Sequence, residues 1–185
     1  KTLLNRVHPI KRFVYGRCGV EKIGGREAIV AEIEPRANSW PRCSGCGSAC
    51  AGYDAGAQPR LFRFVPLWGI DFYLRYRMRR VECRSCGVRV EAVPWASGKS
   101  QCTHVMLSFL AGWAKRLSWS ETAACFRISW DTVFKAVSAA VDWGLQHRDL
   151  EGVEALGVDE LACGKGHRKF MTLVYQIDEG SRRLL

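Results

Sequence analysis

The chain has 185 residues, and its 28 Lys and Arg against 18 Asp and Glu give a formal net charge of +10. A composition with 48% apolar and 25% charged residues is typical of a globular protein and excludes general disorder. The apolar runs are much shorter than the ~20 residues of a membrane span, and the first residues lack a signal-peptide pattern.

The positive charge is concentrated in residues 1–100, which hold 18 of the Lys and Arg and 8 of the Asp and Glu; the rest of the chain is balanced. A concentrated basic half favours a nucleic-acid partner, because neutralising phosphates releases condensed counterions. The alternative is a solvated basic surface that binds nothing. The sequence does not begin with Met, which indicates a fragment or a processed chain.

The first elements are predicted to be a β-hairpin of residues 11–20 and 26–34, with Gly24 and Gly25 supplying the turn. Residues 42–58 are rich in Cys, Gly, Ala and Ser, which is typical of a loop-rich knuckle. Strand patterns follow at 61–65 and 70–82.

Two near-identical CxxCG segments place Cys43 and Cys46 in one knuckle and Cys83 and Cys86 in another. Four thiolates form the closed tetrahedral shell of structural zinc, so we predict a Zn²⁺ site with no open catalytic position. The alternatives are a CxxC redox pair, unrelated core cysteines, and replacement of one ligand by Cys50. The isolated cysteines are expected to be buried apolar residues: Cys18, Cys102, Cys125 and Cys163.

Basic side chains gather on the predicted strand at 70–82, opposite an apolar face made by Phe72, Leu74, Tyr76 and Met78. We expect arginines on this strand and beside the second knuckle to contact DNA phosphates: Arg75, Arg77, Arg79, Arg80 and Arg84. The alternative is a solvated strand face.

Residues 91–100 are interpreted as a linker, after which the apolar period becomes helical. A helix is predicted from Val105 to Leu117. A second helix starts with a capping box formed by Ser118 and Glu121 and extends to about Phe126.

A third helix, capped by Ser129, completes the order of a helix-turn-helix. At the start of this helix we expect four residues to enter the major groove: Ser129, Trp130, Thr132 and Lys135. The turn has Arg127 where such motifs often have glycine. A small helical bundle without a DNA partner is the alternative.

The final segments are predicted strands at 153–160 and 169–178, with the start of a third at 182–185. The first strand ends in Asp159 and Glu160. A carboxylate on a central strand can be one ligand of a hard divalent cation, whereas a strand-end acid facing solvent is the alternative for Asp159.

The order of these parts resembles the ISL3-type bacterial insertion-sequence transposases. The resemblance extends over about residues 3–185 and rests on the basic hairpin, the paired CxxCG knuckles, the Leu117–Ala124 run and the Gly157–Asp178 run. It implies an α+β multidomain fold: a small β-rich zinc ribbon, a helix-turn-helix, and the first strands of an RNase H-like α/β domain. The implied boundaries are 1–94, 95–150 and 151–185.

The resemblance also implies a function, namely binding of double-stranded DNA at the terminal inverted repeats of the element. In the complete protein it implies Mg²⁺-dependent strand cleavage and transfer by an Asp-Asp-Glu triad whose first acid is Asp159. The other two acids would lie beyond residue 185, so we expect this chain to bind DNA without cutting it. A bacterial cytoplasmic, nucleoid-associated location and a homo-oligomer of the full-length protein follow from the same resemblance.

Three other functions remain open from the residues alone. A zinc-dependent helix-turn-helix transcriptional regulator without catalytic activity would not need the acidic strand around Asp159. An RNA-binding zinc-ribbon protein would not need the helix-turn-helix. A structural protein stabilised by a bound metal would need neither the acidic strand nor the helix-turn-helix.

Overall fold

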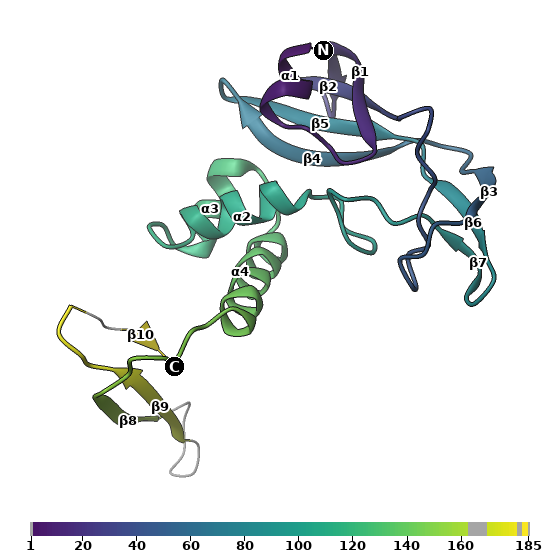
Figure 1. Ribbon diagram of the computed structural model, residues 1–185. Helices are drawn as coiled ribbons and strands as arrows, with labels where there is room; N and C mark the ends of the chain where they lie inside the picture. Colours follow the sequence, from purple (N-terminus) through teal and green to yellow (C-terminus); the bar gives the residue numbers. More distant parts are fainter. Residues whose placement is uncertain (1, 163–169, 181–182, 185) are drawn as a thin grey trace. The chain divides into compact units, whose positions relative to one another are not determined.

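The computed structural model describes residues 2–162, 170–180 and 183–184, and the chain divides into two compact units, Lys1–Asp142 and Trp143–Leu185 (Figure 1). The first unit contains a four-stranded sheet, a three-stranded sheet and a helical segment, and the second contains a three-stranded sheet. Among the described residues, no helix is both long and apolar enough to cross a membrane.

The four-stranded sheet has the strand order β1-β2-β5-β4, in which β2 and β5 run parallel and the other neighbours run antiparallel. Its strands are β1 (Phe13–Ile23), β2 (Arg26–Pro35), β4 (Arg60–Leu67) and β5 (Ile70–Tyr76), with helix α1 (Thr2–Val7) against β1. The predicted N-terminal hairpin is confirmed, and Gly24 and Gly25 both have the positive φ that its turn requires.

The core of this sheet is closed by a segment that the sequence did not assign to it. Tyr15, Phe62 and Leu74 are fully buried, and the Trp95 ring packs edge-on against Phe13 at a centroid distance of 4.9 Å. The interpretation of residues 91–100 as a linker is therefore wrong in its first half, because the Trp95 side chain is 4% exposed. Burial of such a large ring stabilises the sheet by about 2 kcal/mol or more.

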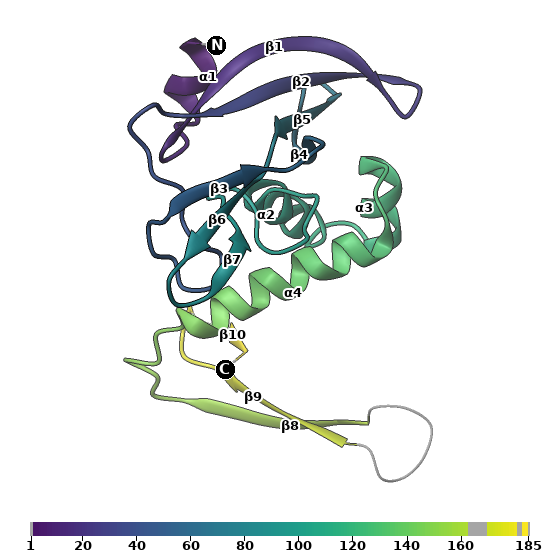
Figure 2. The same ribbon diagram turned by 90° about the vertical axis from the view of Figure 1, so that its right-hand side faces the viewer.

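The second sheet has the order β3-β6-β7 and consists of β3 (Ala51–Ala55), β6 (Arg79–Cys83) and β7 (Gly87–Val90), which lie side by side in Figure 2. The predicted single strand at 70–82 is wrong, because β5 ends at Tyr76 and β6 begins at Arg79 in a different sheet. The alternation of apolar and basic residues continues to Arg79, and its phase shifts at Arg80, after which Val81 and Cys83 are the buried positions.

Glu91 connects the two sheets. Its side chain is fully buried, and its carboxylate accepts hydrogen bonds from the Tyr76 hydroxyl, from the Arg79 amide at 2.9 Å and from Arg79 Nη2 at 2.7 Å. Burial and this carboxylate raise the pKa of Tyr76. A buried carboxylate is stable only when it is paired and hydrogen-bonded in this way.

The helical segment consists of α2 (His104–Trp113), α3 (Trp119–Phe126) and α4 (Trp130–Gln146). Helix α2 ends four residues before the predicted Leu117. The capping box of α3 is confirmed, since the Glu121 amide donates to Ser118 Oγ at 3.2 Å and the Ser118 amide to the Glu121 carboxylate at 2.8 Å. Met106 and Leu110 of α2 form a core with Ala136 of α4.

Three charged side chains connect the helices to the four-stranded sheet. Arg63 Nη2 on β4 donates to Asp71 Oδ1 on β5 at 2.9 Å and to the Phe126 carbonyl at the end of α3 at 2.6 Å. Arg127, whose φ of 50° places it in the left-handed region, donates to the same Asp71 oxygen at 3.0 Å. These three residues are called the Arg63–Asp71–Arg127 clamp below.

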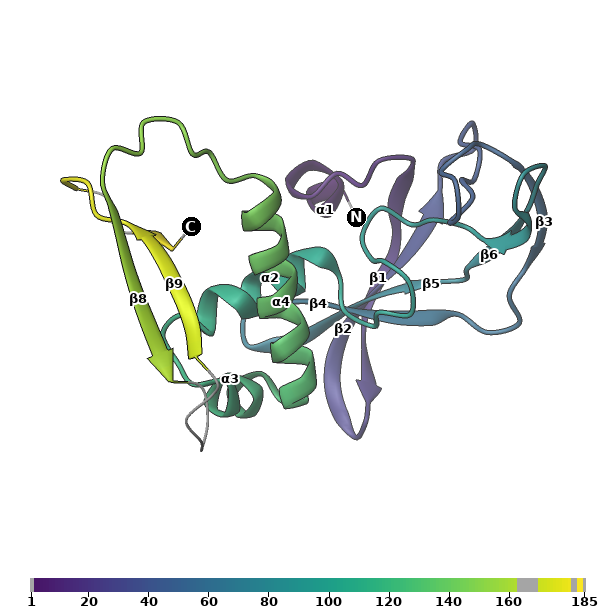
Figure 3. The same cartoon turned by 90° about the horizontal axis from the view of Figure 1, so that it is seen from below.

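In the second unit, β8 (Leu156–Ala162) and β9 (Phe170–Gln176) lie side by side as an antiparallel pair (Figure 3), and β10 (Arg183–Leu184) pairs with the other edge of β9. The predicted return to strands is confirmed for the described residues. Residues 163–169 lie outside the described residues, and this range includes Cys163 and the start of the predicted strand at 169.

Candidate metal centre and nucleic-acid interface

The four knuckle cysteines converge as the spacing predicted. Their Sγ atoms all lie within 4.8 Å of one another, although Cys46 and Cys83 are 37 positions apart. Each knuckle turns through a left-handed glycine, with φ of 72° at Gly47 and 71° at Gly87. These turns let the backbone fold around the sulfurs, and the Gly45 amide donates to Cys43 Sγ at 3.3 Å.

The electrostatics of the cluster fit a bound cation. Hydrogen bonds from Ser48 lower the pKa of Cys46 to about 6. Contacts with the Cys46 and Cys43 thiols raise the pKa of Cys86 to about 12. Four sulfurs this close cannot all carry a negative charge alone, whereas a divalent ion with a preference for sulfur would let all four ionise.

Cys50 is not a member of this group of four. It is buried beside Cys43 and Cys83, and its thiol donates to the Ser48 carbonyl at 3.4 Å. The other isolated cysteines differ from the expectation: Cys18 and Cys125 are exposed, and Cys102 is half-buried.

Three of the five arginines assigned to phosphate contact already have carboxylate partners. Arg75 binds Glu21 and Glu32, Arg79 binds Glu91, and Arg80 binds Asp54. The remaining two, Arg77 and Arg84, pair with no carboxylate among the residues that the structure describes. Of the predicted five, Arg75 thus lies on β5, Arg79 and Arg80 lie on β6, and the two unpaired arginines lie outside both strands.

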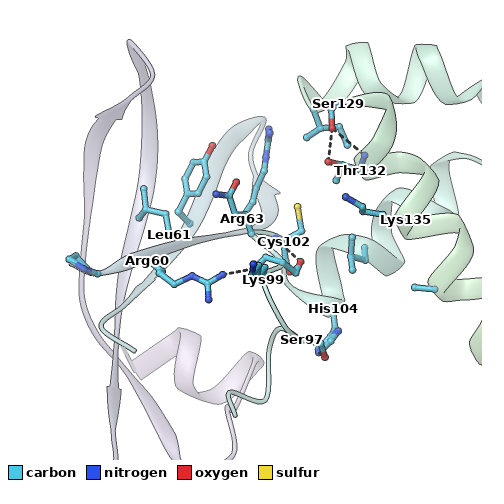
Figure 4. A pocket seen from close by; sticks show the side chains of 17 residues that line it. Arg60, Leu61, Arg63, Ser97, Lys99, Cys102, His104, Ser129, Thr132 and Lys135 are labelled. Carbon is cyan, nitrogen blue, oxygen red and sulfur yellow. Dashed lines mark hydrogen bonds between the residues drawn. The ribbon is translucent and has the colours of Figure 1, made fainter. Parts of the chain in front are cut away.

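The residues assigned to the start of α4 lie on two flanks of the helix. Ser129, Thr132 and Lys135 line a cavity that faces β4 (Figure 4). Trp130 is absent from that lining, and its ring packs 5.2 Å from Trp119 and stacks on Phe134 at 5.8 Å. Three of the four residues thus line the cavity, and Trp130 lies in an aromatic cluster with Trp119 and Phe134.

The cavity between β4 and α4, called the β4–α4 cavity below, has a volume of about 1190 Å³. Its basic lining residues are Arg60, Arg63, Lys99, His104 and Lys135. The Ser129 hydroxyl lies 2.8 Å from the Thr132 hydroxyl and accepts from the Thr132 amide at 3.2 Å, which caps α4. Arg60, Lys99 and His104 were missed by sequence reasoning, because no local pattern joins them.

Comparisons with known proteins show what the chain is similar to. Residues 40–86 match the zinc finger of the transposases of IS204, IS1001, IS1096 and IS1165, the zinc ribbon of the ISL3 group. The transposase for insertion sequence element IS1557 of Mycobacterium tuberculosis is 31% identical over 162 residues, which cover 85% of this chain and 35% of the relative. The zinc-finger match and the transposase relatives support an ISL3-type insertion-sequence transposase.

A second relative is the transposase for IS1001 of Bordetella parapertussis, which is 26% identical over 144 residues, or 77% of this chain and 34% of the relative. The chain thus spans about a third of the length of the curated relatives it matches. No solved structure matches it.

The family and the sulfur cluster together support a structural Zn²⁺ in the ISL3-type ribbon, held by Cys43, Cys46, Cys83 and Cys86. They do not favour the transcriptional-regulator alternative, because the relatives are transposases.

The acid implied as the first ligand of Mg²⁺ in the ISL3-type protein is Asp159 on β8. Asp159 is exposed, and its Oδ1 accepts a hydrogen bond from the Glu160 amide at 2.8 Å. Among the described residues, the cysteine cluster is the one group of three or more metal-ligating side chains, and Asp159 is outside it.

Proposed function

We propose that this chain binds double-stranded DNA and recognises the terminal inverted repeats of its insertion sequence. The match of residues 40–86 to a transposase zinc finger carries this proposal. The concentration of positive charge in residues 1–100, which include that finger, supports it.

The sequence-reading part of the proposal is a helix-turn-helix made by α3 and α4. The short α3 is followed by the turn Arg127–Ser129 and by the 17-residue α4. Arg127 supplies the left-handed residue for which such turns often use glycine. Thr132 and Lys135 on α4 would then contact the DNA. Trp130 would contribute indirectly, through its packing against the Trp119 and Phe134 rings.

The phosphate contacts of the ribbon are proposed for Arg77 and Arg84, which have no described carboxylate partner. Arg75, Arg79 and Arg80 would each have to give up an ion pair before binding a phosphate. Exposed pairs such as Arg80 with Asp54 can exchange at little cost, whereas the buried Glu91 holds Arg79 firmly.

The test is fluorescence anisotropy with three labelled probes: duplex DNA that carries the end of the element, a scrambled duplex, and RNA of the same sequence. We expect the end-containing duplex to bind most tightly. Arg77→Ala should weaken binding to both duplexes and reduce the salt slope by about one, whereas Thr132→Ala should alter the preference between them. Equal binding of all three probes would contradict end recognition.

For a longer protein we propose Mg²⁺-dependent strand cleavage and transfer with Asp159 as one metal ligand. From these 185 residues we expect no cleavage, because a lone exposed carboxylate cannot hold two ions. A nicking assay with Mg²⁺ or Mn²⁺ tests this expectation. Nicking that disappears in Asp159→Ala would contradict it.

A further inference from the structure

The walls of the β4–α4 cavity carry positive charge and no negative charge. Its 17 lining residues include Arg60, Arg63, Lys99 and Lys135, and none is Asp or Glu, although the chain contains 18 acids. His104 lies beside Ser97 in the same lining (Figure 4). A concave surface with this composition attracts anions.

Two of the four Lys and Arg side chains are already partnered. Arg63 is engaged in the Arg63–Asp71–Arg127 clamp. Lys135 Nζ lies 2.6 Å from Asp131 Oδ2, but both side chains are about two-thirds exposed, so this pair is weak and can exchange.

The other two cations, Arg60 and Lys99, are available to bind an anion. Arg60 donates to the Ser100 carbonyl at 3.1 Å, and its guanidinium lies 4.8 Å from the centre of the Phe62 ring, so its position is fixed while its charge is not neutralised. Lys99 is exposed and has no acidic partner among the described residues. The contacts of Arg60 leave its charge without a counter-ion, and Lys99 forms no described ion pair.

The size and polarity of the cavity indicate the class of ligand. At about 1190 Å³ it is larger than the ~300–1,000 Å³ of small-molecule pockets. The hydroxyls of Ser97, Ser129 and Thr132 are neutral donors that suit phosphate oxygens. An extended polyanion fits these features better than a compact metabolite does.

We infer that the β4–α4 cavity holds the sugar–phosphate backbone of one strand of duplex DNA. Arg60 and Lys99 bind phosphates from the sheet side, and Lys135 binds from the helix side. This inference rests on the proposed DNA-binding function and extends it, because it adds a phosphate-binding surface outside the zinc ribbon. The strand held here would position the duplex for contact with the start of α4.

The test compares two double variants with the same change in charge. Arg60→Gln with Lys99→Gln removes the two available cations of the cavity. Lys22→Gln with Arg26→Gln removes two exposed cations of the β1–β2 hairpin, outside the cavity. Circular dichroism and thermal unfolding check that both variants remain folded, and Lys99→Gln alone covers the case in which Arg60 is needed for the fold.

We expect the cavity variant to bind duplex DNA about tenfold more weakly at 0.15 M salt, with a salt slope lower by about two. The hairpin variant should bind within about twofold of the wild type. Equal losses in the two variants, or no loss in the cavity variant, would overturn the cavity assignment and leave the proposed function intact.

Failure of the wild type to bind any duplex would overturn both the proposed function and this inference. Tighter binding of single-stranded DNA or RNA that depends on Arg60 and Lys99 would overturn the duplex assignment, because the cavity would then hold a different polymer.

Discussion

The guanidinium of Arg127 lies 3.0 Å from the carboxylate of Asp71, although the two residues are 56 positions apart. Arg127 occupies the left-handed position that ends α3, where a side chain other than glycine costs about 1 kcal/mol or more. Its contact with Asp71 offsets that cost and fixes the turn before α4 against the sheet. An arginine in place of the usual glycine therefore has a structural reason.

The Arg63–Asp71–Arg127 clamp gives the first prediction. Asp71→Asn should lower the free energy of unfolding by about 2 kcal/mol, because it leaves Arg63 without a counter-charge at 12% side-chain exposure. Urea denaturation followed by circular dichroism measures the change. As a control, Arg127→Gly should shift stability by less than about 0.5 kcal/mol, since relief of the left-handed backbone offsets the lost pair. An unchanged free energy of unfolding in Asp71→Asn would show that the clamp does not stabilise the fold.

Loss of zinc should unfold the ribbon. Cys83→Ser removes one of four converging sulfurs, so we expect loss of bound zinc and of the β3-β6-β7 sheet. A strong chelator should have the same effect on the wild type. Metal content is measured by mass spectrometry, and Cys125→Ser, which changes an exposed thiol outside the cluster, serves as the control. Wild-type zinc content in Cys83→Ser would refute the four-cysteine site.

Trp68 should be replaceable with a gain in stability. It forms the two-residue turn between β4 and β5 with Gly69, has a φ of 52°, and is 85% exposed. Asn tolerates the left-handed region, and Asn-Gly is the preferred sequence of this turn, so Trp68→Asn should raise the free energy of unfolding by up to about 1 kcal/mol. Thermal unfolding measures the change. Trp68→Ala, which keeps the strained backbone, should give no gain, and an equal gain in both variants would refute the explanation.

The capping box predicts a dependence on pH. Hydrogen bonds from Ser118 lower the pKa of Glu121 in the folded state. The cap therefore contributes stability above the ordinary glutamate pKa, and this contribution is lost as the pH falls through the lowered value. Comparison of acid unfolding in the wild type and Glu121→Gln checks the sign. The variant should show a smaller loss of stability over that range, and identical acid curves would contradict the prediction.

The sequence by itself was sufficient for features that depend on local chemistry. The left-handed glycines, the CxxCG spacing and the Ser118–Glu121 box each involve a few neighbouring residues, so their patterns predicted the N-terminal hairpin, the sulfur cluster and the start of α3. The same local reading did not find the end of β5, because the alternation of side chains continues through Arg77 and Met78 and shifts phase only at Arg80, inside β6.

Only the tertiary structure decided which charges are neutralised and which remain available. Arg75, Arg79 and Arg80 resemble Arg77 and Arg84 in the sequence, and they differ because Glu21, Glu32, Glu91 and Asp54 approach them from distant segments. The burial of Trp95 and the convergence of Arg60 and Lys99 on the β4–α4 cavity have the same origin. An ion pair, a buried ring or a cavity depends on distances across the fold, and spacing along the chain does not determine those distances.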